Sequence, residues 1–518
     1  MNFKKIKKGF SLLLMGFVLF SLGSCDTDDL LEKEPITDLN EATGIQTEAD
    51  IEAIINGAYD VLQWQVINGP STHMHPIIFQ EIRSDNCISQ WASYWAAGVA
   101  FDDFDAIQPN NTSVLSLWRK WYTAVARANT AIEFATNYDG LTTSESKERL
   151  IAEAKFVRAF AYFELVKHWG DVPLITDYVA TTEDQLIYSR SPKSEIYIQI
   201  ENDLDDAVKV LGTKAEMELG RATKGAAHSL LAKVHLYQGE YQDVVTNCEA
   251  VMALDYELEE NFADNWSLDN EYGKESIFEI GYADGFFSAD FESDQAIYNQ
   301  GSSSYQMFGF IFNSSDDVPG NGGFGNCVPR KGLIDMYDDA DVRKDATFIT
   351  PETVFDDIGP AVNGTDIYQF FWVNPAALET KASMRKYHLP ARVTRSILNM
   401  GASPLNEKVL RYADVLLMHA EAVVMGATGA DGQASLDKVR ARAGLSSIPL
   451  TVQNVKDERR RELATEGWDR FTDLVRWGDA ASVLAFKNFS TGRDELLPIP
   501  QSEINLVGKE VLDQNPGY

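Results

Sequence analysis

Apolar side chains recur three or four residues apart along most of the chain, which is the spacing of an amphipathic helix. Ile51, Ile55 and Leu62, for example, fall on one helical face. Helices are predicted over 48–64, 114–138, 144–169, 192–211, 223–237, 241–254, 406–425, 434–443 and 452–466, with a last helical turn over 469–477 and an extended tail over 496–518.

The helix predicted over 144–169 is apolar over an unusually wide arc. One stripe contains Leu150 and Val157, and a second stripe beside it contains Phe156 and Phe160. A helix that is apolar on two sides has to bury both, as it does inside a stack of helices.

A short stretch near the middle of the chain resembles a helical repeat. Ala226 and Ala232 are small enough for neighbouring helices to approach closely, Gly239 suits a tight turn, and Tyr241 can pack on the next helix. We therefore predict a mainly α fold, a tetratricopeptide-like helical-repeat scaffold. An irregular helical bundle is the alternative.

The helical pattern weakens between about 255 and 404, where Gly, Asn, Asp, Ser and aromatic residues are frequent. This stretch is interpreted as a loop-rich insertion region with short strands over 276–280 and 365–371. No linker or charge block divides the chain, and stacked repeats can grow without one. The expected organisation is a single large domain over 46–518 that contains the insertion.

The first residues are typical of an exported lipoprotein. Lysines between positions 4 and 8 precede an apolar run over 10–22, which is too short to cross a bilayer. Cys25 follows small residues, as the lipid-accepting cysteine of a bacterial lipobox does, and several acyl chains anchor a protein stably. We expect a signal peptide over 1–24 and a lipidated tether over 25–45. A plain secretory signal with an incidental cysteine is the alternative.

The net charge narrows the classes of partner that the chain can bind. The formal net charge is −33, and lysines are the only charged residues before Cys25, so the remainder is more acidic still. Such a chain is not expected to bind nucleic acid or an anionic lipid surface.

The cysteines indicate thiols and not disulfides. Cys87, Cys248 and Cys327 are widely spaced and odd in number, which favours free buried thiols over a disulfide framework.

Two stretches combine aromatic rings with planar polar groups. Flat apolar rings suit the C–H face of a sugar, and neighbouring amides, carboxylates or guanidinium groups suit its hydroxyls. The alternative is that these rings fill irregular parts of the core or face a protein partner. The ligand-binding candidates are Arg83, Asp85, Asn86, Trp91, Tyr94 and Trp95 in the first stretch and Tyr298 and Tyr305 in the second.

Catalytic and cofactor motifs are missing from the sequence. It contains no nucleophile elbow, zinc-protease motif, P-loop or dinucleotide fingerprint. Adjacent carboxylates arise by chance in a chain with 78 acidic residues, whereas a glycosidase needs two across a cleft. His73 and His75 have no third metal ligand nearby. We expect no enzyme, no catalytic residues, no cofactor and no metal site; a glycosidase is the least favoured alternative.

Several long blocks, in one order, resemble the SusD/RagB family of outer-membrane nutrient-uptake lipoproteins, the starch-utilisation-system type. The similarity runs from the lipobox to the last residue and is weakest in the insertion. The blocks are EAKFVRAF (153–160) with KHWGDVPL (167–174), RYADVLLMHAEA (411–422), ERRRELATEG (458–467), DLVRWG (473–478), LPIPQSEI (497–504) and NPGY (515–518).

This resemblance implies a surface lipoprotein in the outer membrane, facing the cell exterior, that acts as lid on a SusC-type TonB-dependent barrel and captures an oligosaccharide. An interaction scaffold with little ligand affinity of its own is the alternative. Within the blocks, Arg411, Arg459 and Arg476 lie among acidic residues. We expect ion pairs that fix the helical stack, with an anion site as the lesser possibility.

Overall fold

A computed structural model describes residues 47–63, 76–89, 99–138, 140, 143–179, 188–283, 302, 326–350, 354–355, 359–360, 380, 382–386, 388 and 403–518. The part from Glu52 to Tyr518 forms one compact unit. None of the helices in the described ranges combines the length and the apolar character that a membrane crossing requires.

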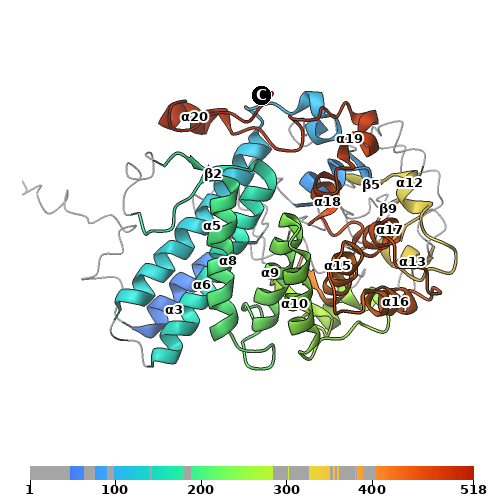
Figure 1. The fold of residues 1–518 in the computed structure, drawn as a ribbon, viewed down its shortest axis with the longest axis horizontal. Helices are drawn as coiled ribbons and strands as arrows, with labels where there is room; N and C mark the ends of the chain where they lie inside the picture. The colour runs from blue at the N-terminus through green and yellow to red at the C-terminus, as the bar shows by residue number, and fades with distance from the viewer. Residues whose placement is uncertain are drawn as a thin grey trace, which may run out of the picture. The chain divides into compact units, whose positions relative to one another are not determined.

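Long helices pack against one another in chain order (Figure 1). α5 (Thr112–Asn137) lies against α6 (Ser144–Trp169), and α6 lies against α8 (Lys193–Val210). α8 then packs on α9 (Lys224–Gln238), and α9 packs on α10 (Tyr241–Met252). Packing between sequence neighbours is typical of helical repeats, and the predicted mainly α scaffold is confirmed.

The stack continues beyond the insertion. α10 packs against α15 (Tyr412–Val424), although the insertion separates the two helices in the sequence. α15 in turn contacts α16 (Gly432–Arg442) and α17 (Val452–Leu463), and α18 (Arg470–Arg476) follows. The chain therefore leaves the stack after α10 and returns to the same place.

Apart from α3, the remaining elements are short. The described helices include α3 (Glu48–Asp60), α12 (Lys331–Ile334), α13 (Arg343–Thr347), α19 (Ala480–Val483), α20 (Gln501–Val507), the π-turn η1 (Ile78–Ile82), and the 3-10 turns η2 (Ala100–Asp102), η3 (Phe104–Ala106), η4 (Phe262–Trp266), η5 (Leu268–Asn270) and η8 (Ala485–Lys487). Antiparallel two-stranded sheets pair β1 (Cys87–Ser89) with β5 (Cys327–Pro329), β2 (Val172–Pro173) with β3 (Arg190–Ser191), β4 (Ser276–Ile280) with β10 (Glu407–Arg411), β6 (Phe348–Ile349) with β9 (Ser383–Met384), and β7 (Val354–Phe355) with β8 (Gly359–Pro360).

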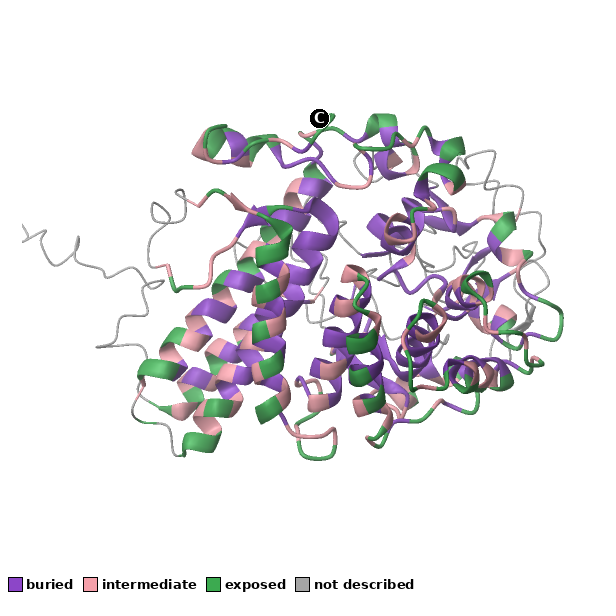
Figure 2. Cartoon of the chain, viewed as in Figure 1, coloured by how far each residue is buried: buried purple, intermediate pink, exposed green. Residues whose placement is uncertain are grey.

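Caps at both ends explain the sharp limits of the central helices. The side chains of Thr143 and Thr223 accept backbone hydrogen bonds at the N-termini of α6 and α9. Gly170 (φ 73°) and Gly239 (φ 77°) end the same helices in conformations that favour glycine. Every residue of 156–169 is buried, so α6 is covered on all sides over this stretch (Figure 2). The two apolar stripes predict this burial correctly.

Two predictions near the C-terminus are wrong. The helix predicted over 406–425 begins with β10, because Glu407–Arg411 pairs with β4 near the start of the insertion. The tail predicted as extended over 496–518 contains α20, which follows Pro500 and ends at Gly508 (φ 89°). A proline before a helix and a glycine after it are ordinary helix signals. Here they enclose a helix of only seven residues, which the sequence pattern did not reveal.

Buried ion pairs join the C-terminal helices, as the sequence predicts. Arg411 Nε donates to Glu466 at 2.9 Å, and its Nη1 donates to Glu462 at 3.1 Å. Arg459 Nη1 donates to Asp414 on α15 at 2.7 Å. These arginines have carboxylate partners within the protein, so the ion-pair interpretation is confirmed over the anion site for both residues.

The three cysteines of the described part are free and buried, which confirms the prediction from their spacing. Cys87 and Cys327 are nevertheless neighbours in space, because Cys87 pairs with Pro329 and Cys327 pairs with Ser89 across the β1–β5 ladder. Burial raises the pKa of both thiols above the ordinary value, so both stay protonated. They contribute to the core as small apolar side chains.

Candidate ligand-binding site

The β1–β5 ladder pairs the chain just before residues 90–98 with the chain just after residues 303–325. Ser89, the last residue of β1, pairs with Cys327, the first residue of β5. Residues 90–98 follow β1 in the chain, and residues 303–325 come shortly before β5. Since the strands are antiparallel, both segments leave the scaffold from the same end of one ladder.

A second anchor holds the other stretch. Ser302 forms an isolated bridge with Ser403, with N–O distances of 2.7 Å and 2.9 Å in the two directions. Its hydroxyl donates to Glu407 of β10 at 2.9 Å. Tyr298 and Tyr305 stand within four residues of this anchor in the sequence. The second stretch is therefore attached to the strand that crosses back into the helical stack.

Arg83, one of the predicted ligand-binding residues, begins the turn that leads into β1. Its side chain is fully buried. Nη2 donates to the backbone carbonyls of Asp494 and Leu496 at 2.7 Å and 3.0 Å, and the guanidinium lies 3.9 Å from the centre of the Phe471 ring. Burial lowers the pKa of Arg83 to about 10. The described contacts of Arg83 are those of a residue that fixes the turn to the C-terminal segment.

Asp85 holds the same turn to two C-terminal helices. Arg460 of α17 and Arg470 of α18 each place a guanidinium nitrogen 2.8 Å from its carboxylate. Burial alone would raise the pKa of Asp85, but Arg470 and Arg460 together outweigh it and keep the pKa below its ordinary value. The carboxylate is therefore ionised and bridges two helices that the sequence places far from it.

Asn86 completes the attachment. Its side-chain oxygen accepts from Arg460 Nε at 2.7 Å, and its amide nitrogen donates to the buried carboxylate of Glu81 at 2.8 Å. Lys487 donates to the carbonyl of Ile82, just before the turn. Polar groups of Arg83, Asp85 and Asn86 thus bind protein partners, and direct ligand contacts by these residues stay predictions.

The remaining candidates lie outside the described residues. This applies to Cys25 with the predicted signal peptide and tether, and to the strand predicted over 365–371. The aromatic candidates in this position are Trp91, Tyr94, Trp95, Tyr298 and Tyr305.

Sequence reasoning missed the residues that hold the turn from outside. Arg460 belongs to the ERRRELATEG block, but nothing local in that block indicates a partner at position 85. Arg470 stands beyond the same block and Lys487 beyond the following one. The structure shows why they matter: each is buried or nearly buried and pairs with a carboxylate of Asp85 or Asp102.

The cavity next to this turn is small. It has a volume of about 20 Å³ and is lined by Asn86, Arg460 and Arg470 together with residues of the buried ion pairs. This is room for about one water molecule and excludes a sugar. Two larger hollows of about 460 Å³ and 470 Å³ lie elsewhere in the described part, the first between the end of α3 and β4 and the second between α5 and α20. None of the predicted ligand residues lines either hollow.

Two family matches cover most of the chain. Residues 29–236 match a family described as "Starch-binding associating with outer membrane", and residues 248–491 match the "SusD family". The SusD-like protein P25 of Formosa agariphila is 26% identical over 550 residues, which cover 98% of this chain and 99% of that protein.

Solved structures show the same fold. A laminarin-binding SusD-like protein is 29% identical, with a TM-score of 0.76, and the match covers 92% of this chain and 100% of that one. Surface glycan-binding protein A from Bacteroides thetaiotaomicron, in complex with laminarihexaose, is 25% identical with a TM-score of 0.77 over 91% of this chain and 100% of its own.

A helical-repeat stack that is interrupted by one long insertion defines a tetratricopeptide-like scaffold protein. With the matches above, the chain belongs to the SusD/RagB family, the starch-utilisation-system type.

Proposed function

We propose that this protein is a surface lipoprotein that binds an oligosaccharide and delivers it to a SusC-type TonB-dependent barrel in the outer membrane. The observation that supports this most is the β1–β5 ladder. The segment that contains Trp91 begins just after β1, and the segment that contains Tyr305 ends just before β5. Both segments therefore join the rigid scaffold at the same end of this ladder. Relatives that bind laminarin and laminarihexaose make a glycan the first ligand class to test.

In this proposal, Trp91, Tyr94 and Trp95 present ring faces to the sugar, and Tyr298 and Tyr305 approach from the second segment. Apolar ring faces suit the C–H side of a pyranose, while the surrounding polar groups suit its hydroxyls. Arg83, Asp85 and Asn86 act beneath them, because the turn they form sets where the first segment begins. Specificity then lies in the loops and affinity depends on a rigid support.

The lid role and the lipid anchor extend the proposal. A lipid on Cys25 would hold the acidic domain at the outer surface of the outer membrane through the tether over 25–45. The ligand would then be enclosed between this protein and the barrel. Capture without conversion fits the sequence, which offers no catalytic motif, and so the proposed protein is a binding protein and not an enzyme.

Affinity electrophoresis tests the ligand site. The mature protein should be retarded in gels that contain laminarin or another glycan from a panel, and Trp91→Ala combined with Trp95→Ala should lower the affinity at least about tenfold, since each ring contributes on the order of 1 kcal/mol. Tyr178→Ala is the matched control, because this exposed aromatic residue follows α6 in the chain and packs against Phe134 of α5.

Retardation that is equal in the double variant and the native protein would contradict the proposed site. Failure of every glycan in the panel to bind, together with stable copurification of a barrel, would instead favour the interaction-scaffold alternative. Turnover of a glycan by the purified protein would overturn the assignment as a binding protein.

A further inference from the structure

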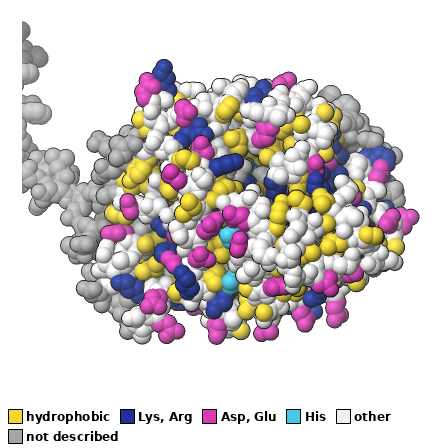
Figure 3. Space-filling view, viewed as in Figure 1, with side chains coloured by type: hydrophobic (Ala, Val, Ile, Leu, Met, Phe, Trp, Pro, Cys, Tyr) yellow, Lys and Arg dark blue, Asp and Glu magenta, His cyan; other side chains and the backbone are white. Residues whose placement is uncertain are grey.

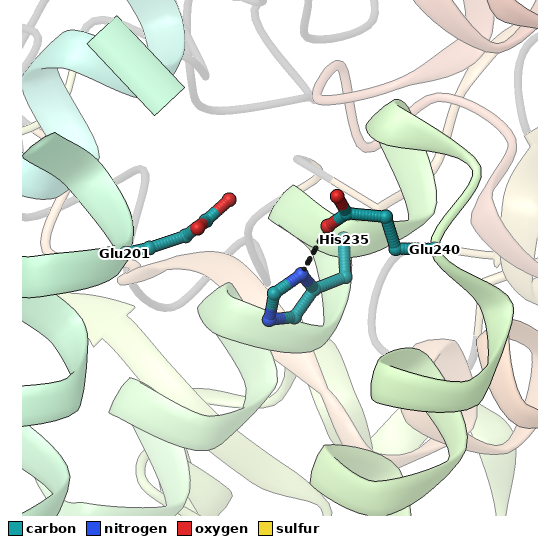
Figure 4. Close-up of side chains that lie close together, drawn as sticks. All are labelled: Glu201, His235 and Glu240. Carbon is teal, nitrogen blue, oxygen red and sulfur yellow. Dashed lines mark hydrogen bonds and ion pairs between the residues drawn. The ribbon is translucent and has the colours of Figure 1, made fainter. Parts of the chain in front are cut away.

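Three metal-ligating side chains meet on the outside of the helical stack, away from the ladder. Glu201 comes from α8, His235 from the last turn of α9, and Glu240 from the position just before α10 (Figure 4). One ligand atom of each lies within 4.8 Å of the other two. His235 Nδ1 and Glu240 Oε2 are already 2.7 Å apart.

The turn between α9 and α10 brings two of these residues together. Gly239 takes a left-handed conformation, with φ 77°, and reverses the chain. The backbone nitrogen of Glu240 then donates to the carbonyl of His235 at 3.0 Å, so both side chains project on one side of the turn. Gln238 donates to Glu201 at 2.6 Å and fixes the third carboxylate beside them.

The charge of the cluster favours a cation. No Lys or Arg in the described ranges forms an ion pair with Glu201 or Glu240. By contrast, the buried carboxylate of Glu153 is within 3.1 Å of both Arg149 and Arg221. On the face seen in Figure 3, a histidine lies among acidic side chains over α8 and α9. Two carboxylates here have only neutral or weakly basic neighbours.

The set of donor atoms indicates the kind of metal. An imidazole nitrogen with two carboxylate oxygens is a ligand set that Zn²⁺ accepts, with a fourth position left for water. Ca²⁺ and Mg²⁺ prefer oxygen ligands alone and would not use the imidazole. Bonds of about 2.0–2.2 Å bring tetrahedral ligands to roughly 3.4 Å from one another, so the side chains need only a small rotamer adjustment.

We propose that Glu201, His235 and Glu240 bind one divalent transition-metal ion that joins α8 to the α9–α10 turn. Coordination through Nδ1 replaces the hydrogen bond to Glu240, and the proton of the neutral ring then lies on Nε2. The ion connects two successive repeats of the stack, so it stabilises the folded chain by mass action. This site is independent of the glycan proposal.

Metal titration of the full mature chain tests the site. After removal of metal with a chelator, Zn²⁺ should bind by calorimetry with one tight equivalent per chain, and Co²⁺ should give the visible absorption of a tetrahedral site. Zn²⁺ should also raise the melting temperature. His235→Ala and, separately, Glu240→Gln should each weaken Zn²⁺ binding at least about tenfold and abolish the shift in melting temperature.

His228→Ala is the matched control. His228 lies on the same helix, and its Nδ1 contacts Asn247 at 2.8 Å rather than a carboxylate. Zn²⁺ affinity should not change in this variant. The proposal fails if the native protein takes up no stoichiometric Zn²⁺ at 100-fold molar excess, or if His235→Ala and Glu240→Gln both bind it as the native protein does. Glu240→Gln keeps the shape of the side chain, so a fold defect in one variant does not decide the result.

Discussion

At the scale of single residues, Asp85 connects the candidate site to the stack. It has Arg460 on one side and Arg470 on the other, and its side chain is 12% exposed. Asp85→Asn leaves two neighbouring guanidinium groups without their shared counter-charge. The free energy of unfolding should fall by about 3 kcal/mol, the usual cost of removing one partner of a buried pair. Urea denaturation measures this loss.

A matched control exists on the surface. Asp206 also lies between two cations, Lys155 and Lys209, but its side chain is 48% exposed. Asp206→Asn should cost less than about 1 kcal/mol, because water screens the pair. Equal losses in the two variants would show that Asp85 does not hold the turn. If the turn also positions the aromatic segment, Asp85→Asn should weaken glycan retention while Asp206→Asn leaves it unchanged.

At the scale of elements, the turn between α17 and α18 explains a glycine of the ERRRELATEG block. Gly467 has φ 88°, and a Cβ there would lie 2.6 Å from the side chain of Ile77 and 2.7 Å from its backbone nitrogen. Ile77 directly precedes η1, which leads to the turn under the candidate site. The close approach of two backbones therefore requires a residue without a side chain.

Gly467→Ala tests that requirement. Gly478 is the control, because its φ of 74° imposes similar backbone strain but nothing lies within 4 Å of a Cβ at that position. Gly467→Ala should lower the free energy of unfolding by about 1–3 kcal/mol more than Gly478→Ala does, the usual cost of overpacking. Chemical denaturation of both variants checks this; equal losses would mean that the contact with Ile77 is unimportant.

The same scale shows what local sequence can predict. The limits of α6 match the predicted 144–169, and β4 matches the predicted 276–280. Both predictions rest on patterns within one segment. β10 was missed because its partner strand β4 lies more than 120 residues earlier in the chain, and its sequence EKVLR does not alternate apolar and polar residues as a half-buried strand does.

At the scale of the whole molecule, the insertion returns the chain to the helix it left, so α10 and α15 pack as neighbours. Periodicity predicts the stack but not which segments meet across it. The sequence accordingly selects residues 83–95 as a candidate site, yet it gives no sign that Asp85 pairs with Arg460 or that Arg83 reaches the carbonyls of 494 and 496. Such contacts depend on the final topology, which local patterns do not determine.

The pH dependence of the free energy of unfolding is also a property of the whole chain. One buried histidine, His168, contributes to it. His168, in the last turn of α6, is 3% exposed and packs edge-on against Phe79. Burial lowers its pKa to about 4, although Glu164 nearby partly opposes the shift. An unfolded chain has an ordinary histidine pKa of about 6.5.

Between pH 6.5 and pH 4, the unfolded chain therefore binds a proton at His168 that the folded chain does not. Stability must fall as the pH decreases through this window, by up to about 3 kcal/mol from this residue. His168→Phe removes the titrating group and keeps an aromatic ring in the core. Urea denaturation at pH 7, 6, 5 and 4 should show a weaker loss of stability in the variant than in the native protein. Buried carboxylates that do not contact His168 titrate in both proteins and cancel in the difference. Glu164 loses the part of its pKa lowering that comes from His168, but Lys167 still lowers its pKa in the variant. Parallel pH profiles would therefore refute the assignment to His168.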